Sequence, residues 1–240
     1  MSADLPLFNE LEIVSNNTWR KIDKSKFKHC DNIEFWTYTD TDKETYVDIE
    51  NHIIYIKREP LLDIMNGDGT YRTFSKTIYA LQELNKHVNY DYIIRTNNST
   101  WLNIPLLNLF LSYIDDDSLI FGGTIYSCFW STFNLYCGGN LMIFAKRTVD
   151  ILLNNVKDPV ALENQIIGAD DNMIFGILNS RLSNLHLPQS RYYHSLNEFK
   201  FIKNQLPENI DWSYVAYQVK TFNVNVSDRI EWDVRKMYKL

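Results

Sequence analysis

The sequence predicts an α/β protein with a mostly parallel mixed sheet that helices cover on both faces. Short apolar, β-branched segments alternate with segments whose apolar residues recur at helical spacing. The chain has 240 residues, of which 45% are hydrophobic and 22% charged, and it contains no low-complexity or Pro/Gly-rich linker. Such a chain can bury a substantial core. We therefore expect a single domain spanning residues 1–240.

The first predicted elements follow from local composition. Ser15 is a candidate helix cap ahead of Trp19. Residues 33–38 and 52–57 are predicted strands because they are rich in aromatic and β-branched residues. The segment 73–85 is a predicted helix because its apolar residues recur every three or four positions.

The later elements alternate in the same way. Pro105 suits the first turn of a helix, and four apolar residues after position 171 lie on one helical face. The predicted elements are a strand at 92–95, a helix at 104–113, strands at 118–121 and 141–145, helices at 148–154 and 171–182, short strands within 214–221 and a helix at 228–238.

Composition excludes several classes of function. A net charge of −6 and no basic run longer than residues 24–28 argue against nucleic acid as a partner. Three scattered cysteines fit neither a disulfide framework nor a zinc site. There is no signal peptide, and the longest apolar stretch, residues 104–114, is too short for a transmembrane segment. We expect a cytoplasmic protein, and the lack of an anchor favours a bacterial or viral origin.

Polar clusters follow three of the predicted strands. They are Thr96–Ser99, Gly122-Gly123 and Asp40-Thr41-Asp42. In open α/β sheets, ligands bind beyond the carboxyl ends of the strands. These clusters are therefore candidate binding loops, although Asp and Thr are also ordinary turn residues.

Four segments together resemble a known family. They read Tyr-Arg-Thr-Phe-Ser-Lys-Thr at 71–77, Tyr-Ile-Ile-Arg-Thr-Asn-Asn-Ser at 92–99, Tyr-Cys-Gly-Gly-Asn-Leu-Met-Ile at 136–143 and Ala-Asp-Asp-Asn-Met-Ile-Phe-Gly at 169–176. In this order they resemble the β-1,3-galactosyltransferase and fringe-like glycosyltransferases, which have the GT-A (Rossmann-like) fold. Asn17-Thr18-Trp19 resembles the family's early Arg-x-Thr-Trp region.

The resemblance implies an inverting transfer from a nucleotide-sugar, a UDP-sugar, to a hydroxyl of a saccharide acceptor. A carboxylate then removes the proton from the attacking hydroxyl, ideally with a pKa near the working pH. Asp171 is the first candidate for this base and Asp170 the second, because they match the family's acidic pair. The pair also fits a purely structural role at the start of a helix.

The donor side departs from the family. Asn97, Asn98 and Ser99 stand where the family has the aspartates that hold a divalent cation, so Mn²⁺ or Mg²⁺ is doubtful. Cationic side chains could replace the metal because they pair with phosphates. A weak metal could instead be held by the substrate with another carboxylate or His194, or the site binds without catalysing. The donor-binding candidates are Lys76, Arg95, Thr96, Asn97, Asn98, Ser99 and Lys220, with Arg229 as a further cation.

Two glycine pairs, Gly122-Gly123 and Gly138-Gly139, complete the candidate site. Glycine permits close approach of the backbone to a ligand, and it also serves in plain strand-to-loop turns. Two rival interpretations stay open: a non-catalytic nucleotide-sugar or glycan-binding protein on the same fold, and an unrelated α/β nucleotide-binding or assembly protein.

Overall fold

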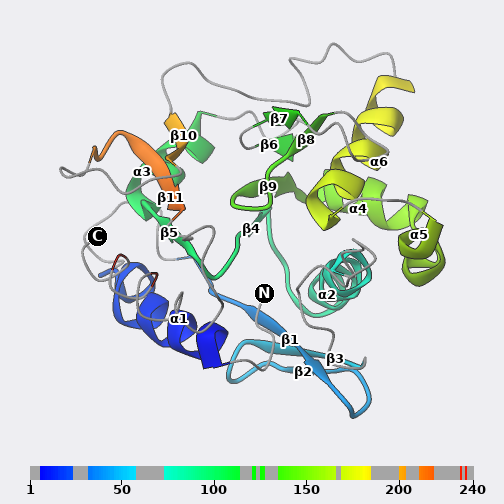
Figure 1. Ribbon diagram of the computed structural model, residues 1–240, viewed down its shortest axis with the longest axis horizontal. Helices are drawn as coiled ribbons and strands as arrows, with labels where there is room; N and C mark the ends of the chain where they lie inside the picture. Colours follow the sequence, from blue (N-terminus) through cyan, green and yellow to red (C-terminus); the bar gives the residue numbers. More distant parts are fainter. Residues whose placement is uncertain are drawn as a thin grey trace.

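The structure is a computed structural model that describes residues 6–23, 32–57, 73–113, 121–122, 125–127, 135–165, 169–184, 200–203, 211–218, 233 and 236. It is a mixed α/β protein (Figure 1). Its elements in chain order are α1 (Pro6–Asn17), η1 (Trp19–Lys21), β1 (Thr37–Thr41), β2 (Tyr46–Asp48), β3 (Ile53–Lys57), α2 (Phe74–His87), β4 (Tyr92–Arg95), β5 (Thr100–Leu102), α3 (Ile104–Ser112), β6 (Phe121–Gly122), β7 (Ile125–Ser127), β8 (Leu135–Cys137), β9 (Met142–Ala145), α4 (Lys146–Asn155), α5 (Pro159–Gln165), α6 (Asp170–Asn184), β10 (Lys200–Lys203) and β11 (Tyr214–Gln218).

The strand β9 lies at the centre of the molecule and is buried on both faces. Successive side chains of a strand point to opposite faces, so residues 141–145 contribute to two separate hydrophobic clusters. Leu141, Ile143 and Ala145 pack with residues of α1, α3, β5 and β11. Met142 and Phe144 pack with residues of α2, α4 and α6. Helices therefore cover both sides of the β4-β9-β6 sheet, as the sequence predicts.

The strand directions differ from the prediction. Among the described strands, only β1–β3 and β10–β11 pair in parallel. The pairings of β9 with β4 and β6, of β5 with β11, of β2 with β3 and of β7 with β8 are antiparallel. The expectation of a mostly parallel sheet is thus wrong for these strands. Burial on both faces produces the same continuous apolar run in either direction, so the pattern does not encode strand direction.

Most of the predicted elements are present. The strand at 92–95 has the predicted bounds, and the predicted helices at 73–85, 104–113, 148–154 and 171–182 correspond to α2, α3, α4 and α6. Asn103 caps α3, since its Oδ1 accepts a hydrogen bond from the Leu106 backbone N–H at 3.3 Å. The predicted strand at 118–121 and the helix at 228–238 lie largely outside the described residues.

The N-terminal part corrects two expectations. Ser15 does not cap a helix; it lies inside α1 and its hydroxyl donates to the Leu11 carbonyl at 2.8 Å. The first predicted strand is displaced toward the C-terminus and becomes β1. No helix among the described residues is long and apolar enough to cross a bilayer.

Candidate functional site

A buried ion pair links the end of β4 to the start of α6. The Arg95 guanidinium donates one hydrogen bond to Asp170 Oδ2 and another to the Gly139 carbonyl. Both side chains of the pair are almost excluded from solvent. Burial disfavours the charged guanidinium, but the nearby Asp170, Tyr38 and Asp171 favour it, and the net result raises the pKa of Arg95. Arg95 therefore stays cationic and holds three segments together.

A hydroxyl chain extends this pair toward β1. The Thr77 hydroxyl donates to Asp170 Oδ2 at 3.0 Å. The Tyr38 hydroxyl lies 3.2 Å from the Thr77 oxygen, and it is the donor there because the Thr77 proton already points to Asp170. Burial raises the pKa of Tyr38, so its proton is retained at neutral pH. Asp170 is thus committed to Arg95 and Thr77.

A second buried ion pair lies beside the first. Lys76 Nζ, in the first turn of α2, donates to Asp40 Oδ2 at 3.0 Å, and the exposed fractions of the two side chains are 1% and 4%. The ammonium also lies 5.9 Å from the centre of the Tyr38 ring. Asp40 therefore belongs to β1 and neutralises Lys76, so it does not lie in a loop after the strand as the sequence predicts. Its neighbour Asp42 is exposed.

Asp171 differs from Asp170 in its surroundings. Its Oδ2 accepts the Gly139 N–H at 2.7 Å and its Oδ1 accepts the Asn172 N–H at 2.8 Å, while the residue remains partly exposed. Burial is the main cause that raises the pKa of Asp171, and the charge of Asp170 adds to it. The two backbone hydrogen bonds and Arg95 act in the opposite direction, and the pKa is about 6. The carboxylate is ionised at neutral pH and is more basic than an ordinary aspartate.

The acidic pair also has the structural role that its sequence position predicts. Asp170 and Asp171 occupy the first turn of α6. Negative charge at this end is favourable because the free N–H groups of the first turn point toward it. A helix terminus holds side chains rigidly, so the structural and the catalytic interpretations of the pair are compatible.

The polar loop after β4 is tied to the turn before β9 by neutral groups. The Thr96 hydroxyl donates to the Asn140 carbonyl at 2.8 Å, and Asn97 Nδ2 donates to Asn140 Oδ1 at 3.2 Å. Asn140 Nδ2 in turn donates to Gln218 Oε1 at 3.0 Å. Sequence reasoning missed Asn140 and Gln218, because an amide in a turn or a strand carries no signal of its own. Ser99 is buried at the end of this loop.

The donor atoms of this loop do not suit a divalent cation. Asn97 Oδ1 is buried and has no hydrogen-bond partner among the described residues, so it is an amide oxygen that could serve as a ligand. A single neutral oxygen is a weak site for a hard cation, which prefers several carboxylate oxygens. Within the described part of the chain, no three His, Cys, Asp or Glu side chains gather as a metal site would require. The nearby Asp40 and Asp170 are already paired with Lys76 and Arg95.

Gly139 is the glycine that the site requires. A Cβ built on it would overlap Arg95 Nη1 and lie 3.3 Å from Asp171 Oδ2. No side chain fits between the turn and the ion pair unless Arg95 moves. Gly138 is buried beside it, and the backbone of Gly122 pairs with Ile143 at the edge of the β9 sheet.

The remaining candidates of the sequence analysis are not described by the structure. Gly123, Lys220, His194 and Arg229 lie outside the described residues. The structure does bring Lys76, Arg95, Gly139, Asp170 and Asp171 together, although they come from four segments of the chain.

A buried glutamate that the sequence analysis missed occupies the N-terminus of α2. Glu163 Oε1 accepts the N–H groups of Phe74 and Ser75 at 2.7 and 3.2 Å, and Oε2 accepts the Ser75 hydroxyl at 2.6 Å. Free N–H groups at a helix N-terminus are a common phosphate site. Here a side chain of α5 satisfies them, so this helix end does not offer a ready anion site.

Comparison with known proteins adds little to this geometry. No protein-family model matches the sequence, and no curated protein matches it. A solved structure described as a glycosyltransferase involved in the glycosylation of the major capsid of PBCV-1 is similar at 13% identity, with a TM-score of 0.41, over 79% of this chain and 84% of that one. At that similarity, the function has to be inferred from the residues of this chain.

Proposed function

We propose that the chain is an inverting glycosyltransferase that moves a sugar from a UDP-sugar to a hydroxyl of a saccharide acceptor. The observation that carries the proposal is the state of Asp171. This carboxylate is partly exposed, it is held by the Gly139 N–H, and its pKa is raised to about 6. The ordered motifs of the sequence support the same reaction.

Asp171 has the properties of a general base. In the proposed step, the acceptor oxygen bonds to the anomeric carbon while its proton passes to Asp171 and the bond from that carbon to the nucleoside diphosphate breaks. A carboxylate with a pKa near 6 is ionised at pH 7.5 and accepts a proton more readily than one with a pKa of 3.8. Asp170 takes a positioning role, because both Arg95 and Thr77 already hydrogen-bond to it.

The nucleotide-sugar donor would bind at the loop after β4, close to two cationic side chains. Thr96–Ser99 would line the diphosphate and ribose with amides and hydroxyls, and Gly138-Gly139 would shape the junction of donor and acceptor. Lys76 and Arg95 are buried and paired with carboxylates, so they would position the loop and the acidic pair instead of contacting the diphosphate. Lys220 stays a donor-binding candidate from the sequence alone. No step of the proposed reaction runs through a metal ion.

Replacing Asp171 by Asn tests the proposal. Transfer from a panel of UDP-sugars to saccharide acceptors should fall by roughly 10²- to 10⁴-fold, the usual contribution of a general base. Thermal unfolding should show that the variant is folded, and Asp91→Asn, at an exposed aspartate directly before β4, serves as the matched control. Undiminished turnover in Asp171→Asn would exclude the assignment of the base.

A non-catalytic nucleotide-sugar or glycan-binding protein is the second candidate. It is favoured by the neutral Asn97-Asn98-Ser99 loop and by the carboxylates that already neutralise Lys76 and Arg95. Calorimetry with UDP-sugars, with and without Mn²⁺, separates the candidates when it is combined with product analysis. Binding without transfer or hydrolysis in either condition would support the second candidate.

A further inference from the structure

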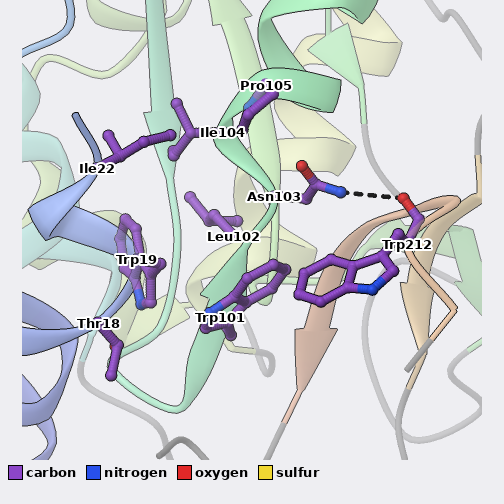
Figure 2. Close-up of a pocket in the computed structure, with 9 residues that line it drawn as sticks. All are labelled: Thr18, Trp19, Ile22, Trp101, Leu102, Asn103, Ile104, Pro105 and Trp212. Atoms are coloured by element: carbon purple, nitrogen blue, oxygen red, sulfur yellow. Dashed lines mark hydrogen bonds between the residues drawn. The ribbon is translucent and has the colours of Figure 1, made fainter. Parts of the chain in front are cut away.

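A cavity of about 490 Å³ lies away from the charged cluster, between η1, the junction of β5 with α3, and the turn before β11 (Figure 2). Its volume is within the range of roughly 300–1,000 Å³ that is usual for small-molecule sites. The residues that line it are Thr18, Trp19, Ile22, Trp101, Leu102, Asn103, Ile104, Pro105 and Trp212.

Three indole rings form much of this wall. Trp101 and Trp212 meet edge to face, with ring centres 5.6 Å apart and planes at 61°. Figure 2 shows Trp19 and Trp212 on either side of Trp101, and Trp19 also meets Phe35 edge to face. Trp19 and Trp101 are nearly buried, whereas Trp212 is 57% exposed. Trp212 therefore presents aromatic surface that the described residues leave open.

The exposed tryptophan is held in place by a polar group of the cavity. Asn103 Nδ2 donates to the Trp212 carbonyl at 3.0 Å, while Asn103 Oδ1 caps α3. One asparagine thus ties the backbone of Trp212 to the first turn of α3, with one hydrogen bond to each. An aromatic wall fixed in advance loses little entropy when a ligand packs against it.

The lack of charged side chains in the lining favours a neutral ligand. None of the nine lining residues carries an ionisable side chain. Among these nine residues a phosphate or a nucleotide finds no cation to offset the loss of its hydration, and the Arg20 guanidinium, 5.2 Å from the centre of the Trp19 ring, is not one of them. A pyranose ring fits better, because its weakly positive C–H face packs on the negative face of an indole while its hydroxyls remain at the polar rim. The exposed edge of Trp212 and the amide of Asn103 supply that rim.

We propose that this cavity is a binding site for a neutral saccharide, separate from the charged cluster of Arg95, Asp170 and Asp171. None of those three residues lines the cavity. The two regions are joined by β5, since Trp101 follows the Asn97–Ser99 loop after one residue, Thr100. The proposal is based on the residues that line this cavity, so it does not depend on the chain being a transferase.

Binding of methyl glycosides of glucose, galactose and mannose, and of N-acetylglucosamine, tests the proposal. In spectra of the ¹⁵N-labelled protein, the indole N–H signals of Trp101 and Trp212 should shift at millimolar sugar, and that of Trp36, outside the lining, should not. Trp212→Leu keeps an apolar side chain without the aromatic face and should weaken binding about tenfold. Trp212→Phe should restore most of the affinity.

Controls separate stacking from loss of the fold and from the proposed transferase. Tyr46→Ala removes an exposed ring of β2 that is outside the cavity, and it should leave saccharide binding unchanged. UDP should neither shift the two indole signals nor compete with the sugars. The proposal is overturned if no sugar shifts these signals, or if Trp212→Leu binds as tightly as the native chain. Neither result would alter the expected loss of transfer in Asp171→Asn.

Discussion

Arg95 and Asp170 are 75 residues apart in the chain, yet they form an ion pair whose side chains are only 4% and 6% exposed. The pair joins the last residue of β4 to the first residue of α6. It also fixes the Gly139 turn, because the same guanidinium binds the Gly139 carbonyl. The geometry around Asp171 therefore depends on Arg95, because the Gly139 N–H donates to Asp171 while the Gly139 carbonyl accepts from Arg95.

Removing Arg95 should strongly destabilise the fold. Arg95→Met leaves Asp170 buried without its cation, and the free energy of unfolding should fall by roughly 3–5 kcal/mol in urea denaturation. Adding Asp170→Asn removes the uncompensated charge, so the double variant should lose less than the sum of the single variants. Lys57→Met is the control, since the Lys57–Glu44 pair is exposed and its loss should cost about 1 kcal/mol or less. Strict additivity at Arg95 and Asp170 would contradict this account.

The pKa of Asp171 predicts how its replacement affects stability. The folded protein holds this proton with a pKa of about 6, against 3.8 for an ordinary aspartate, so the unfolded chain binds fewer protons between these values. Stability from this group is therefore present below pH 3.8 and is lost as the pH rises through 6. Asp171→Asn should be more stable than the native chain at pH 7.5, by on the order of 3 kcal/mol, and the difference should vanish near pH 4. Unfolding curves over this pH range check the sign; a variant that is less stable at pH 7.5 would contradict it.

The same pKa predicts the pH dependence of the proposed transfer. Protonation of Asp171 removes the base, so the rate should fall as the pH is lowered through about 6. The measurement is kcat/KM for transfer between pH 5 and 8. A rate that is constant over this range would contradict the role of Asp171, even if the Asn variant is inactive for another reason.

Gly139→Ala should disturb the same cluster from the backbone side. The added Cβ would overlap Arg95 Nη1, so the guanidinium would have to shift from its place beside Asp170. The expected loss is about 1–3 kcal/mol in urea denaturation. In an Arg95→Met background, where the long guanidinium is absent, the further loss should be much smaller. An equal loss in both backgrounds would show that the cost arises elsewhere.

Glu163 should stabilise the first turn of α2 by accepting hydrogen bonds from its N–H groups. Glu163→Ala leaves the N–H groups of Phe74 and Ser75 without their acceptor, so the protein should lose about 1–2 kcal/mol. Hydrogen exchange at these two amides should also become faster. Gln165→Ala, an exposed position on the same helix, should change neither property. Unaltered exchange at Phe74 and Ser75 in Glu163→Ala would contradict the capping role.

The sequence by itself determined the elements whose signal is local. Residues 92–95 form the predicted strand, and α2, α3, α4 and α6 lie where helical spacing or a helix-starting proline places them. Asp170 and Asp171 open α6 because acidic residues favour a helix N-terminus. These features depend on consecutive residues, so composition and periodicity were sufficient to predict them.

Only the tertiary structure decided strand direction and the state of each charge. The apolar run of β9 is the same whether its neighbours are parallel or antiparallel, and the structure makes both of them antiparallel. Lys76 and Arg95 read as free cations in the sequence, but the fold brings Asp40 and Asp170 against them. Asp170 and Asp171 are adjacent in the chain, yet Asp170 is buried against Arg95 whereas Asp171 keeps a partly exposed carboxylate, whose pKa is raised. Burial and charge pairing depend on contacts between residues far apart in the sequence, so local patterns do not contain them.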